Sequence, residues 1–298
     1  MANTIKQSFS DYASRLEITD RQESTVSIGR RNAVDAIKSE IELHEDESRV
    51  IGSWARNTLT RYLSEGDVDV MVIMHYGKNK EWETADGTIG ILNKFKRLLQ
   101  NTYPNTNMQI DENCVTMQFS EFRLDVVPSF SNTGGYYKIP DTIKRRWIQT
   151  DPLSFAERIT TVNKNMNETF IPIIKMAKGW NREVGWPIKS FHLENLLYHH
   201  YKTYNQGYTY PSTLNVFFSK LPQYLAGACY EPVRGERVDT YLDNSAQTTK
   251  RQIAISKAQR AATKSASAIE YEEKYPNTPE YAINEWKELF GTFFPAYG

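Results

Sequence analysis

The chain has 298 residues, of which 40% are hydrophobic, so it can bury one large core or the cores of two lobes. Its 36 Lys and Arg residues balance 36 Asp and Glu residues, which excludes a surface built around bulk attraction to phosphate. Two cysteines, Cys114 and Cys229, are too few for a disulfide framework or a cysteine-based zinc site. The N-terminal segment has no apolar signal core and no apolar run is long enough to cross a bilayer, so we expect a cytoplasmic protein without a membrane partner.

The first part of the chain predicts strands interspersed with helices. Apolar residues recur at helical spacing over residues 21–44, which predicts one long helix. A short strand is expected next, breaking at Gly52, with a helical turn after it. The alternation in DVDVMVIM, residues 67–74, predicts a strand in which Asp67 and Asp69 share one face.

A third carboxylate follows in a similar setting. Residues 87–103 repeat apolar side chains at helical spacing and predict a helix. Residues 113–130 then predict two short strands, the second of which carries Asp125 between Leu124 and Val126.

From residue 151 onward the pattern is mostly helical. Helices are predicted at 154–166, 169–180, 190–204, 212–225 and 246–275, with a last helix ending near Phe290. Strands come first and helices follow, which indicates an α+β fold with two lobes. We place a catalytic lobe with a long N-terminal helix at 1–145 and a helical lobe at 146–298.

Aspartates are unexpected in apolar strands, because the burial of an unpaired carboxylate is energetically unfavourable. Hard divalent cations such as Mg²⁺ prefer carboxylate oxygens, and two such ions serve phosphoryl transfer. The pair Asp67 and Asp69 could bind both ions from one strand face, and Asp125 could complete the site or accept a proton. Gly52 and Ser53 could present N–H groups and a hydroxyl to a phosphate.

The order Gly52-Ser53, Asp67-x-Asp69 and a later Asp125 resembles the nucleotidyltransferase superfamily of DNA polymerase β. The resemblance implies a polymerase-β-like lobe with a mixed sheet, and Asp67, Asp69 and Asp125 as catalytic metal ligands. The implied cofactor is two Mg²⁺ ions, which Mn²⁺ could replace. A turn or cap role for Asp67 and an ion pair of Asp125 with Arg123 are the structural alternatives.

Residues 173–199 resemble the helical-lobe segment of cGAS and the oligoadenylate synthetases. By that resemblance Lys178 and Ser190 would hold the donor triphosphate, and Phe191 would stack on the donor base. The alternatives are a solvated Lys178, an N-cap at Ser190 and a core position for Phe191.

The whole chain is similar to the bacterial cGAS/DncV-like nucleotidyltransferases (CD-NTases) of CBASS anti-phage systems, in the order of "GS…DVDVMV", "LDVVPSF…YYKIPD" and "KSFHLE". That resemblance implies ribonucleoside triphosphates, ATP among them, as substrates, and a cyclic di- or trinucleotide as product. Unlike animal cGAS, the chain has no Cys/His zinc insertion, and its net charge is zero, so we expect no obligatory nucleic acid. A template-independent RNA nucleotidyltransferase of the poly(A) or CCA-adding type, and an inactive fold used as a binding module, remain alternatives.

The chain ends in PAYG, after Gly291 stops the last helix and Pro295 prevents its continuation. We expect residues 295–298 to form an exposed, mobile tail. CD-NTases with an E1/E2-like ancillary protein are similar in having a C-terminal residue that is conjugated to a target. The resemblance implies this role for Gly298, and a frayed end is the alternative.

Overall fold

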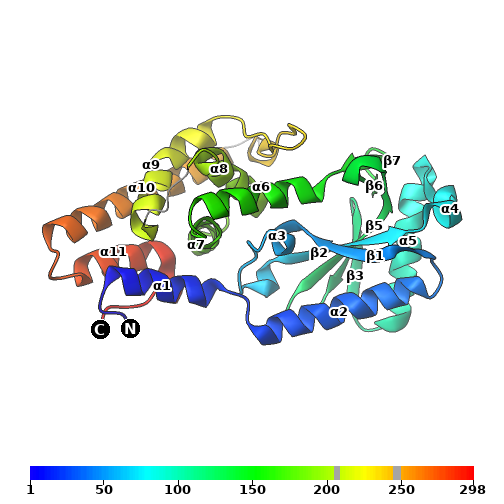
Figure 1. The fold of residues 1–298 in the computed structure, drawn as a ribbon, viewed down its shortest axis with the longest axis horizontal. Coiled ribbons are helices and arrows are strands. Elements are labelled where there is room, and N and C mark those ends of the chain that lie inside the picture. The colour runs from blue at the N-terminus through cyan, green and yellow to red at the C-terminus, as the bar shows by residue number, and fades with distance from the viewer. Residues whose placement is uncertain (205–208, 244–249) are drawn as a thin grey trace. The chain divides into compact units, whose positions relative to one another are not determined.

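The computed structural model describes residues 1–204, 209–243 and 250–298 (Figure 1). The chain divides into two compact units, which we describe separately. The sheet unit comprises Ile18–Ala156, and the helical unit combines Met1–Glu17 with Glu157–Gly298. The boundary that the sequence suggested, between residues 145 and 146, instead falls inside the sheet unit, at a turn between two paired strands.

The sheet unit is built on a seven-stranded mixed sheet with the strand order β1-β2-β5-β4-β3, extended from β5 by β6 and β7. Strands β2 and β5 are parallel, and the other pairings are antiparallel. The strands are β1 (Leu43–Ile51), β2 (Asp67–Met74), β3 (Asn107–Asp111), β4 (Cys114–Gln118), β5 (Arg123–Ser131), β6 (Tyr137–Asp141) and β7 (Arg146–Thr150).

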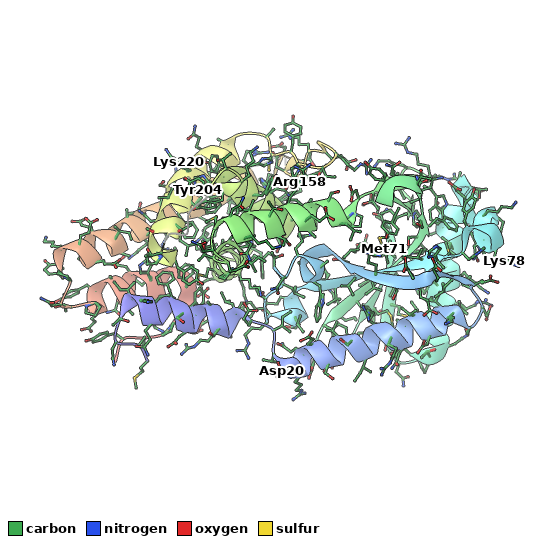
Figure 2. All side chains as sticks on the ribbon, in the orientation of Figure 1. Asp20, Met71, Lys78, Arg158, Tyr204 and Lys220 are labelled. Atoms are coloured by element: carbon green, nitrogen blue, oxygen red, sulfur yellow. The ribbon has the colours of Figure 1, made fainter. Side chains whose placement is uncertain are left out.

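Four helices accompany the sheet: α2 (Asp20–Lys38), α3 (Gly52–Ala55), α4 (Tyr76–Asn79) and α5 (Ala85–Thr102). The long helices α2 and α5 share a core with one face of the sheet, because Val68, Val70 and Val72 of β2 alternate toward them. The opposite face of β2 carries Met71 and Ile73, which form a smaller cluster with side chains of β4, β5 and β6. Figure 2 labels Met71 on β2. The predicted division of β2 into two faces is therefore confirmed.

The single long helix predicted over 21–44 is wrong at its C-terminal end. Thr19 and Gln22 form a capping box that starts α2. The helix ends at Lys38, and the chain enters β1 at Leu43, which pairs with Met74. The pairing of this segment with β2 outweighs the helical spacing of its few apolar residues.

The helical unit contains seven α-helices within the residues described; six of them confirm the helices predicted after residue 151, and α1 was not predicted. They are α1 (Ile5–Leu16), α6 (Pro152–Asn165, which begins in the sheet unit), α7 (Phe170–Glu183), α8 (Ser190–Tyr201), α9 (Tyr210–Ala226), α10 (Lys250–Lys274) and α11 (Glu280–Phe290). Residues 246–249 of the predicted helix 246–275 lie outside the described residues.

Helix α1 belongs to the helical unit although it lies at the opposite end of the sequence. Phe9 packs edge-on against Trp286 and Phe294, with ring centroids 5.1 Å apart in both pairs. The buried Lys175 of α7 forms an ion pair of 2.6 Å with Glu17, at the end of α1. The first residues of the chain thus complete a core formed mainly by the last ones.

The C-terminal tail is more ordered than the sequence suggested. Gly291 ends α11 at φ 72°, as predicted. Phe294 and Pro295 are nevertheless buried, and the carbonyl of Ala296 accepts a hydrogen bond of 2.9 Å from the amide of Ala2. Tyr297 also pairs with Ala2 in a parallel bridge, so the expected mobile tail is wrong up to Tyr297, although Gly298 is exposed.

Among the described residues, no helix is both long enough and apolar enough to cross a membrane.

Candidate active site

The sheet unit places Asp69 and Asp125 side by side. The two residues are register partners on the parallel strands β2 and β5. Ile51 of β1 pairs with Asp69 on one side, and Thr116 of β4 pairs with Asp125 on the other. Since residues aligned across a sheet share a face, this row lies on the Met71 face, away from the α2/α5 core.

Asp67 lies on the same face, two residues before Asp69. Its carboxylate forms an ion pair with Arg123, the residue opposite it on β5, and both side chains are about two-fifths exposed. The ion pair that the sequence suggested for Asp125 and Arg123 is thus made by Asp67 instead. An exposed pair of this kind contributes little to stability, so Asp67 can exchange Arg123 for another cation at small cost.

Asp125 is the most confined of the three carboxylates. Burial raises its pKa above the usual range and the nearby charge of Asp67 adds to the rise, whereas a hydrogen bond from the Thr116 hydroxyl opposes it. Its Oδ1 atom is buried and has no hydrogen-bond partner among the described residues. A buried carboxylate oxygen without a partner costs about 1–3 kcal/mol, which a bound cation or a proton would recover.

Gly52 provides the close approach that the Asp69 carboxylate needs. It follows β1 directly and starts the short helix α3 with φ 67°, a conformation that favours glycine. A Cβ atom at this position would lie 1.9 Å from Asp69 Oδ2. The carbonyl of the neighbouring Ser53 accepts hydrogen bonds from the amides of Thr58 and Leu59, which fixes this turn.

These residues fit a divalent cation by the chemistry of their donor atoms. Three carboxylates share one sheet face, and one of them offers the buried oxygen of Asp125 without a partner. Within the described residues, however, no three acidic, histidine or cysteine side chains converge closely enough to form a complete metal site. Asp67 would have to turn from Arg123 toward the cation.

The predicted nucleotide-binding residues of the helical unit have three different surroundings. Lys178 is buried in α7, and its Nζ forms an ion pair of 2.6 Å with the fully buried Glu194 of α8. The alternative of a solvated Lys178 is therefore wrong, and in this structure Lys178 is also not exposed to a triphosphate. Its role in nucleotide binding stays a prediction.

Ser190 and Phe191 open helix α8. Lys189, not Ser190, occupies the N-cap position, and no side chain caps this helix end. Phe191 is 40% exposed, so the alternative of a core position is wrong. Both residues remain predicted donor contacts.

Thr116, Asp111 and Cys114 were missed by the sequence reasoning. Thr116 hydrogen-bonds to Asp125, and the negative charge of Asp111 is close enough to raise the Asp125 pKa. Cys114 lies on the same face, where burial and then the charge of Asp125 raise its pKa and keep the thiol protonated. The alternation in CVTMQ indicated a strand, but only its register with β5 brings these side chains to the aspartates.

Comparison with known proteins identifies a matching family model over residues 3–163, described as the Second Messenger Oligonucleotide or Dinucleotide Synthetase domain. A cyclic AMP-AMP-AMP synthase from Acinetobacter sp. is 28% identical over 220 residues, which cover 69% of this chain and 61% of that protein. A probable cyclic nucleotide synthase from Bacillus cereus is 27% identical, over 83% of this chain and 81% of its own length.

A crystal structure of the cyclic AMP-GMP synthase DncV from Vibrio cholerae, a prokaryotic cGAS homolog, is similar to this chain in fold. The TM-score is 0.75 at 13% identity, and the superposition covers 99% of this chain and 98% of DncV. The similarity confirms the predicted α+β fold with a mixed sheet and a helical part.

Proposed function

The chain belongs to the Second Messenger Oligonucleotide or Dinucleotide Synthetase family, and we propose that it joins ribonucleoside triphosphates into a cyclic di- or trinucleotide. The observation that carries this proposal is the pairing of Asp69 with Asp125 across β2 and β5, next to Gly52. The names of both curated relatives describe cyclic nucleotide synthesis and so support the same product class.

In the proposed reaction a ribose hydroxyl of one nucleotide attacks the α-phosphorus of another. A new P–O bond forms, the bond from the α-phosphorus to the bridging oxygen breaks, and pyrophosphate leaves. The hydroxyl proton passes to a base, and we assign that role to Asp125, whose buried Oδ1 atom has no hydrogen-bond partner among the described residues. A second transfer of the same kind closes a dinucleotide ring, and a third closes a trinucleotide ring.

Asp67, Asp69 and Asp125 are the residues that would hold divalent cations, Mg²⁺ first and Mn²⁺ as a substitute. Bound there, the cations supply a counter-charge to the phosphates and lower the pKa of the attacking hydroxyl. The chain itself orients the carboxylates: Thr116 holds Asp125 by a hydrogen bond, and the absence of a side chain at Gly52 leaves room for Asp69.

For the donor nucleotide we retain Ser53, Lys178, Ser190 and Phe191 as proposed contacts, and ATP as one of the substrates. Phe191 is supported by its exposure and Ser190 by its place in the uncapped first turn of α8, where backbone N–H groups favour a phosphate. Lys178 has the weakest support, because a buried carboxylate already neutralises it.

An RNA nucleotidyltransferase would share the carboxylates but would need an RNA-binding surface, and the zero net charge does not favour one. Incubation of the protein with the four ribonucleoside triphosphates and Mg²⁺ tests the proposal. We expect small phosphatase-resistant products by mass spectrometry. Extended RNA, or no product with Mg²⁺ or Mn²⁺, would contradict it.

We also retain the proposal that an E1/E2-like protein conjugates Gly298 to a target. Gly298 is exposed and has no Cβ, so a narrow active site can close around its carboxylate. The bridge between Ala2 and Tyr297, with its hydrogen bond to the Ala296 carbonyl, holds the residues before Gly298, so conjugation would have to use Gly298 alone or separate this pair.

A further inference from the structure

The donor contacts proposed for the helical unit need a positive charge that is free to meet a triphosphate. Proteins usually bind nucleoside triphosphates with a lysine or arginine in addition to the metal ions. Lys178 is not free for this role, because its Nζ lies 2.6 Å from the buried carboxylate of Glu194. Separating this pair would leave Glu194 as an uncompensated charge in the core. Another cation close to the same contacts would avoid that cost.

Lys189 provides such a cation at the start of α8. It is exposed, occupies the N-cap position and directly precedes Ser190 and Phe191. Its carbonyl accepts the first hydrogen bond of the helix, at 3.0 Å from the Leu193 amide. Among the described residues, no acidic side chain forms an ion pair with Lys189. Its ammonium group can therefore bind a phosphate without giving up a carboxylate.

Tyr241 contacts Lys189 at two points. The Tyr241 hydroxyl oxygen accepts a hydrogen bond of 2.8 Å from the Lys189 amide, and the Lys189 Nζ atom lies 5.0 Å from the centroid of the Tyr241 ring. At that distance the negative face of an aromatic ring attracts a cation. The ring restricts the lysine side chain without neutralising its charge, so less conformational entropy is lost when a phosphate binds.

His192 fixes the Tyr241 hydroxyl from the first turn of α8. Its Nδ1 atom shares a hydrogen bond of 3.0 Å with this hydroxyl. Burial lowers the pKa of His192 to about 4, so its ring is neutral at neutral pH and does not repel the Lys189 ammonium group. The positive charge at this end of α8 thus belongs to the lysine and not to the histidine.

A buried carboxylate anchors the segment that carries Tyr241, which is the short helix Thr240–Leu242. Asp239, directly before it, is fully buried, and its carboxylate accepts hydrogen bonds of 2.9 and 3.0 Å from Arg237. Arg251 of α10 forms a second ion pair with the same carboxylate. Charge-assisted contacts of this kind are strong, so Tyr241 is in place before a nucleotide arrives.

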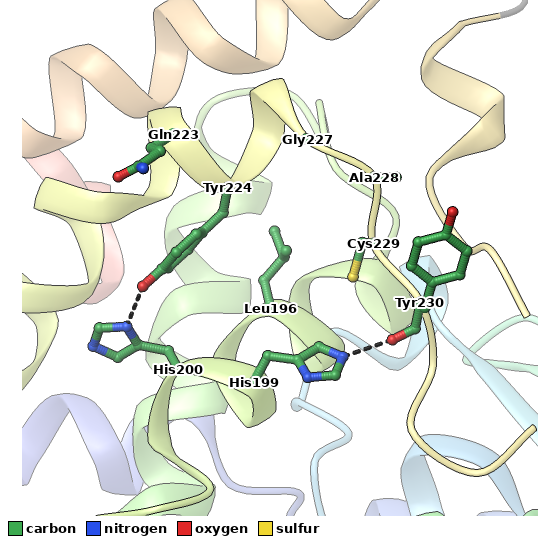
Figure 3. A pocket seen from close by; sticks show the side chains of 9 residues that line it. All are labelled: Leu196, His199, His200, Gln223, Tyr224, Gly227, Ala228, Cys229 and Tyr230. Carbon is green, nitrogen blue, oxygen red and sulfur yellow. Dashed lines mark hydrogen bonds between the residues drawn. The ribbon is translucent and has the colours of Figure 1, made fainter. Parts of the chain in front are cut away.

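The C-terminal end of α8 is held as well. His200 Nδ1 shares a hydrogen bond of 2.7 Å with the Tyr224 hydroxyl, and His199 Nε2 contacts the Tyr230 carbonyl at 2.6 Å (Figure 3). Both partners belong to α9 or to the segment that follows it. Since α8 is held at both ends, Lys189 is presented by a supported helix, which favours a precise binding geometry.

From these contacts we propose that Lys189 binds the triphosphate of the donor nucleotide, and that Tyr241 is a positioning residue that acts through Lys189. Lys189 serves the same donor site as Ser190 and Phe191, so its assignment rests on the proposed function. Phe191 contacts the base while Lys189 meets the phosphates, and a single turn of α8 holds both parts of the nucleotide.

Lys189→Met tests the charge, and Lys189→Arg is the conservative variant that retains it. Lys202→Met is the matched control, because Lys202 is also exposed and follows the other end of α8. The probes are a non-hydrolysable ATP analogue and inorganic triphosphate, both with Mg²⁺, and adenosine, which has no phosphate. Isothermal titration calorimetry of the full chain measures the three affinities.

We expect Lys189→Met to weaken binding of the ATP analogue and of triphosphate at least about tenfold relative to Lys202→Met. Adenosine binding should change less than about twofold, because it involves no phosphate. Lys189→Arg should retain most of the affinity for triphosphate, since the charge is kept.

Tyr241→Leu tests the positioning role. It should weaken triphosphate binding in the parent chain but cause no further loss in the Lys189→Met background, because Tyr241 acts through Lys189. A merely structural effect of Tyr241 would weaken binding by the same factor in both backgrounds. Urea unfolding shows whether each variant is folded, and Tyr241→Phe, which keeps the ring, replaces Tyr241→Leu if that variant unfolds.

Equal triphosphate affinities of Lys189→Met and Lys202→Met, or an equal loss of adenosine binding, would overturn the assignment of Lys189. A parent chain that binds none of the probes would do the same. Additive effects of the two substitutions would overturn the role of Tyr241. Product formation from the four ribonucleoside triphosphates is measured separately. A parent that binds triphosphate through Lys189 but forms no product would contradict only the synthase proposal, whereas an active parent with unchanged binding in Lys189→Met would contradict only the role of Lys189.

Discussion

Lys178 and Glu194 form a buried ion pair of 2.6 Å between α7 and α8, with side chains 4% and 0% exposed. Removing one partner of such a pair leaves an uncompensated charge in the core. We therefore expect Lys178→Ala to lower the free energy of unfolding of the helical unit by about 3–5 kcal/mol. Urea unfolding followed by hydrogen exchange of α7 and α8 peptides measures this.

The double variant Lys178→Met with Glu194→Met separates stability from nucleotide binding. Since both charges are removed together, the double variant should recover most of the lost stability. If Lys178 holds the triphosphate as predicted, calorimetric titration with ATP and Mg²⁺ will show at least about tenfold weaker binding. Unchanged affinity in the folded double variant would remove Lys178 from the donor site.

The second prediction concerns the aspartates. Asp67→Asn, Asp69→Asn and Asp125→Asn should each reduce product formation by about 10³-fold, because cation binding supplies several kcal/mol to the transition state. The fold should survive, since the substitutions remove negative charges that lie close together. Product analysis and Mn²⁺ binding by electron paramagnetic resonance provide two readouts. Variants that unfold, or that keep both Mn²⁺ affinity and activity, would disprove the assignment.

The third prediction uses two glycines of the sheet unit as a matched pair. Gly52 and Gly135 both have positive φ, at 67° and 80°. A Cβ at Gly52 would clash with Asp69, whereas a Cβ at Gly135 would meet nothing within 4 Å. Both alanine variants should lose about 1 kcal/mol of stability through the strained backbone, but only Gly52→Ala should also lose catalysis and Mn²⁺ binding. Comparable activity of the two variants would argue against a role for Gly52 beside Asp69.

The fourth prediction is a pH dependence of stability. Burial lowers the pKa of His192 from 6.5 to about 4, against an opposing effect of Asp239. The unfolded chain therefore binds a proton between these pH values while the folded chain does not, so stability falls as the pH drops from about 6.5 to 4. The loss should reach about 3 kcal/mol from this residue.

His192→Gln should remove that part of the pH dependence. His200, whose pKa is also lowered to about 4, should retain its own contribution in the variant. Urea unfolding of the helical unit at a series of pH values, followed by hydrogen exchange, measures the slope. An identical slope in the parent and the variant would rule out His192 as a source.

The fifth prediction concerns Gly298. Gly298→Glu should block conjugation by a co-expressed E1/E2-like protein while leaving cyclic nucleotide synthesis unchanged in vitro, because Gly298 is exposed and makes no part of the aspartate row. The readout is a higher-mass adduct on a denaturing gel, with its linkage identified by mass spectrometry. An adduct that forms equally well with Gly298→Glu would reject the proposal.

Much of the architecture could be predicted from local patterns. Strand β2 was predicted at its observed bounds because strict alternation leaves little ambiguity, and α5 and α7 follow from regular apolar spacing. Strands β3, β6 and β7 escaped prediction because they are short and their exposed positions break the alternation. These segments become strands because they pair with neighbouring strands of the sheet, and not because of a pattern in their own residues.

The candidate site could likewise be predicted from the sequence only in part. Gly52, Asp67, Asp69 and Asp125 could be selected from the sequence because glycine and carboxylates are unusual at the ends of apolar strands. Thr116 could not, and Arg123 was assigned to Asp125 rather than to Asp67, since both roles depend on the β4/β5 and β2/β5 registers. The burial of Lys178 was equally hidden, because the residue that neutralises it lies on another helix.

The helical unit is formed by two segments, Met1–Glu17 and Glu157–Gly298, which the sheet unit separates in the chain, so it cannot be completed early during synthesis on the ribosome. The sheet unit is one continuous segment, Ile18–Ala156, and can fold as soon as it has emerged. Helix α1 precedes the sheet unit in the chain, whereas Phe290 and Phe294, on which its Phe9 and Tyr12 pack, follow it by more than a hundred residues. The buried face of α1 therefore lacks part of its partners until α11 has been synthesised, which makes α1 a segment that a chaperone would be expected to bind.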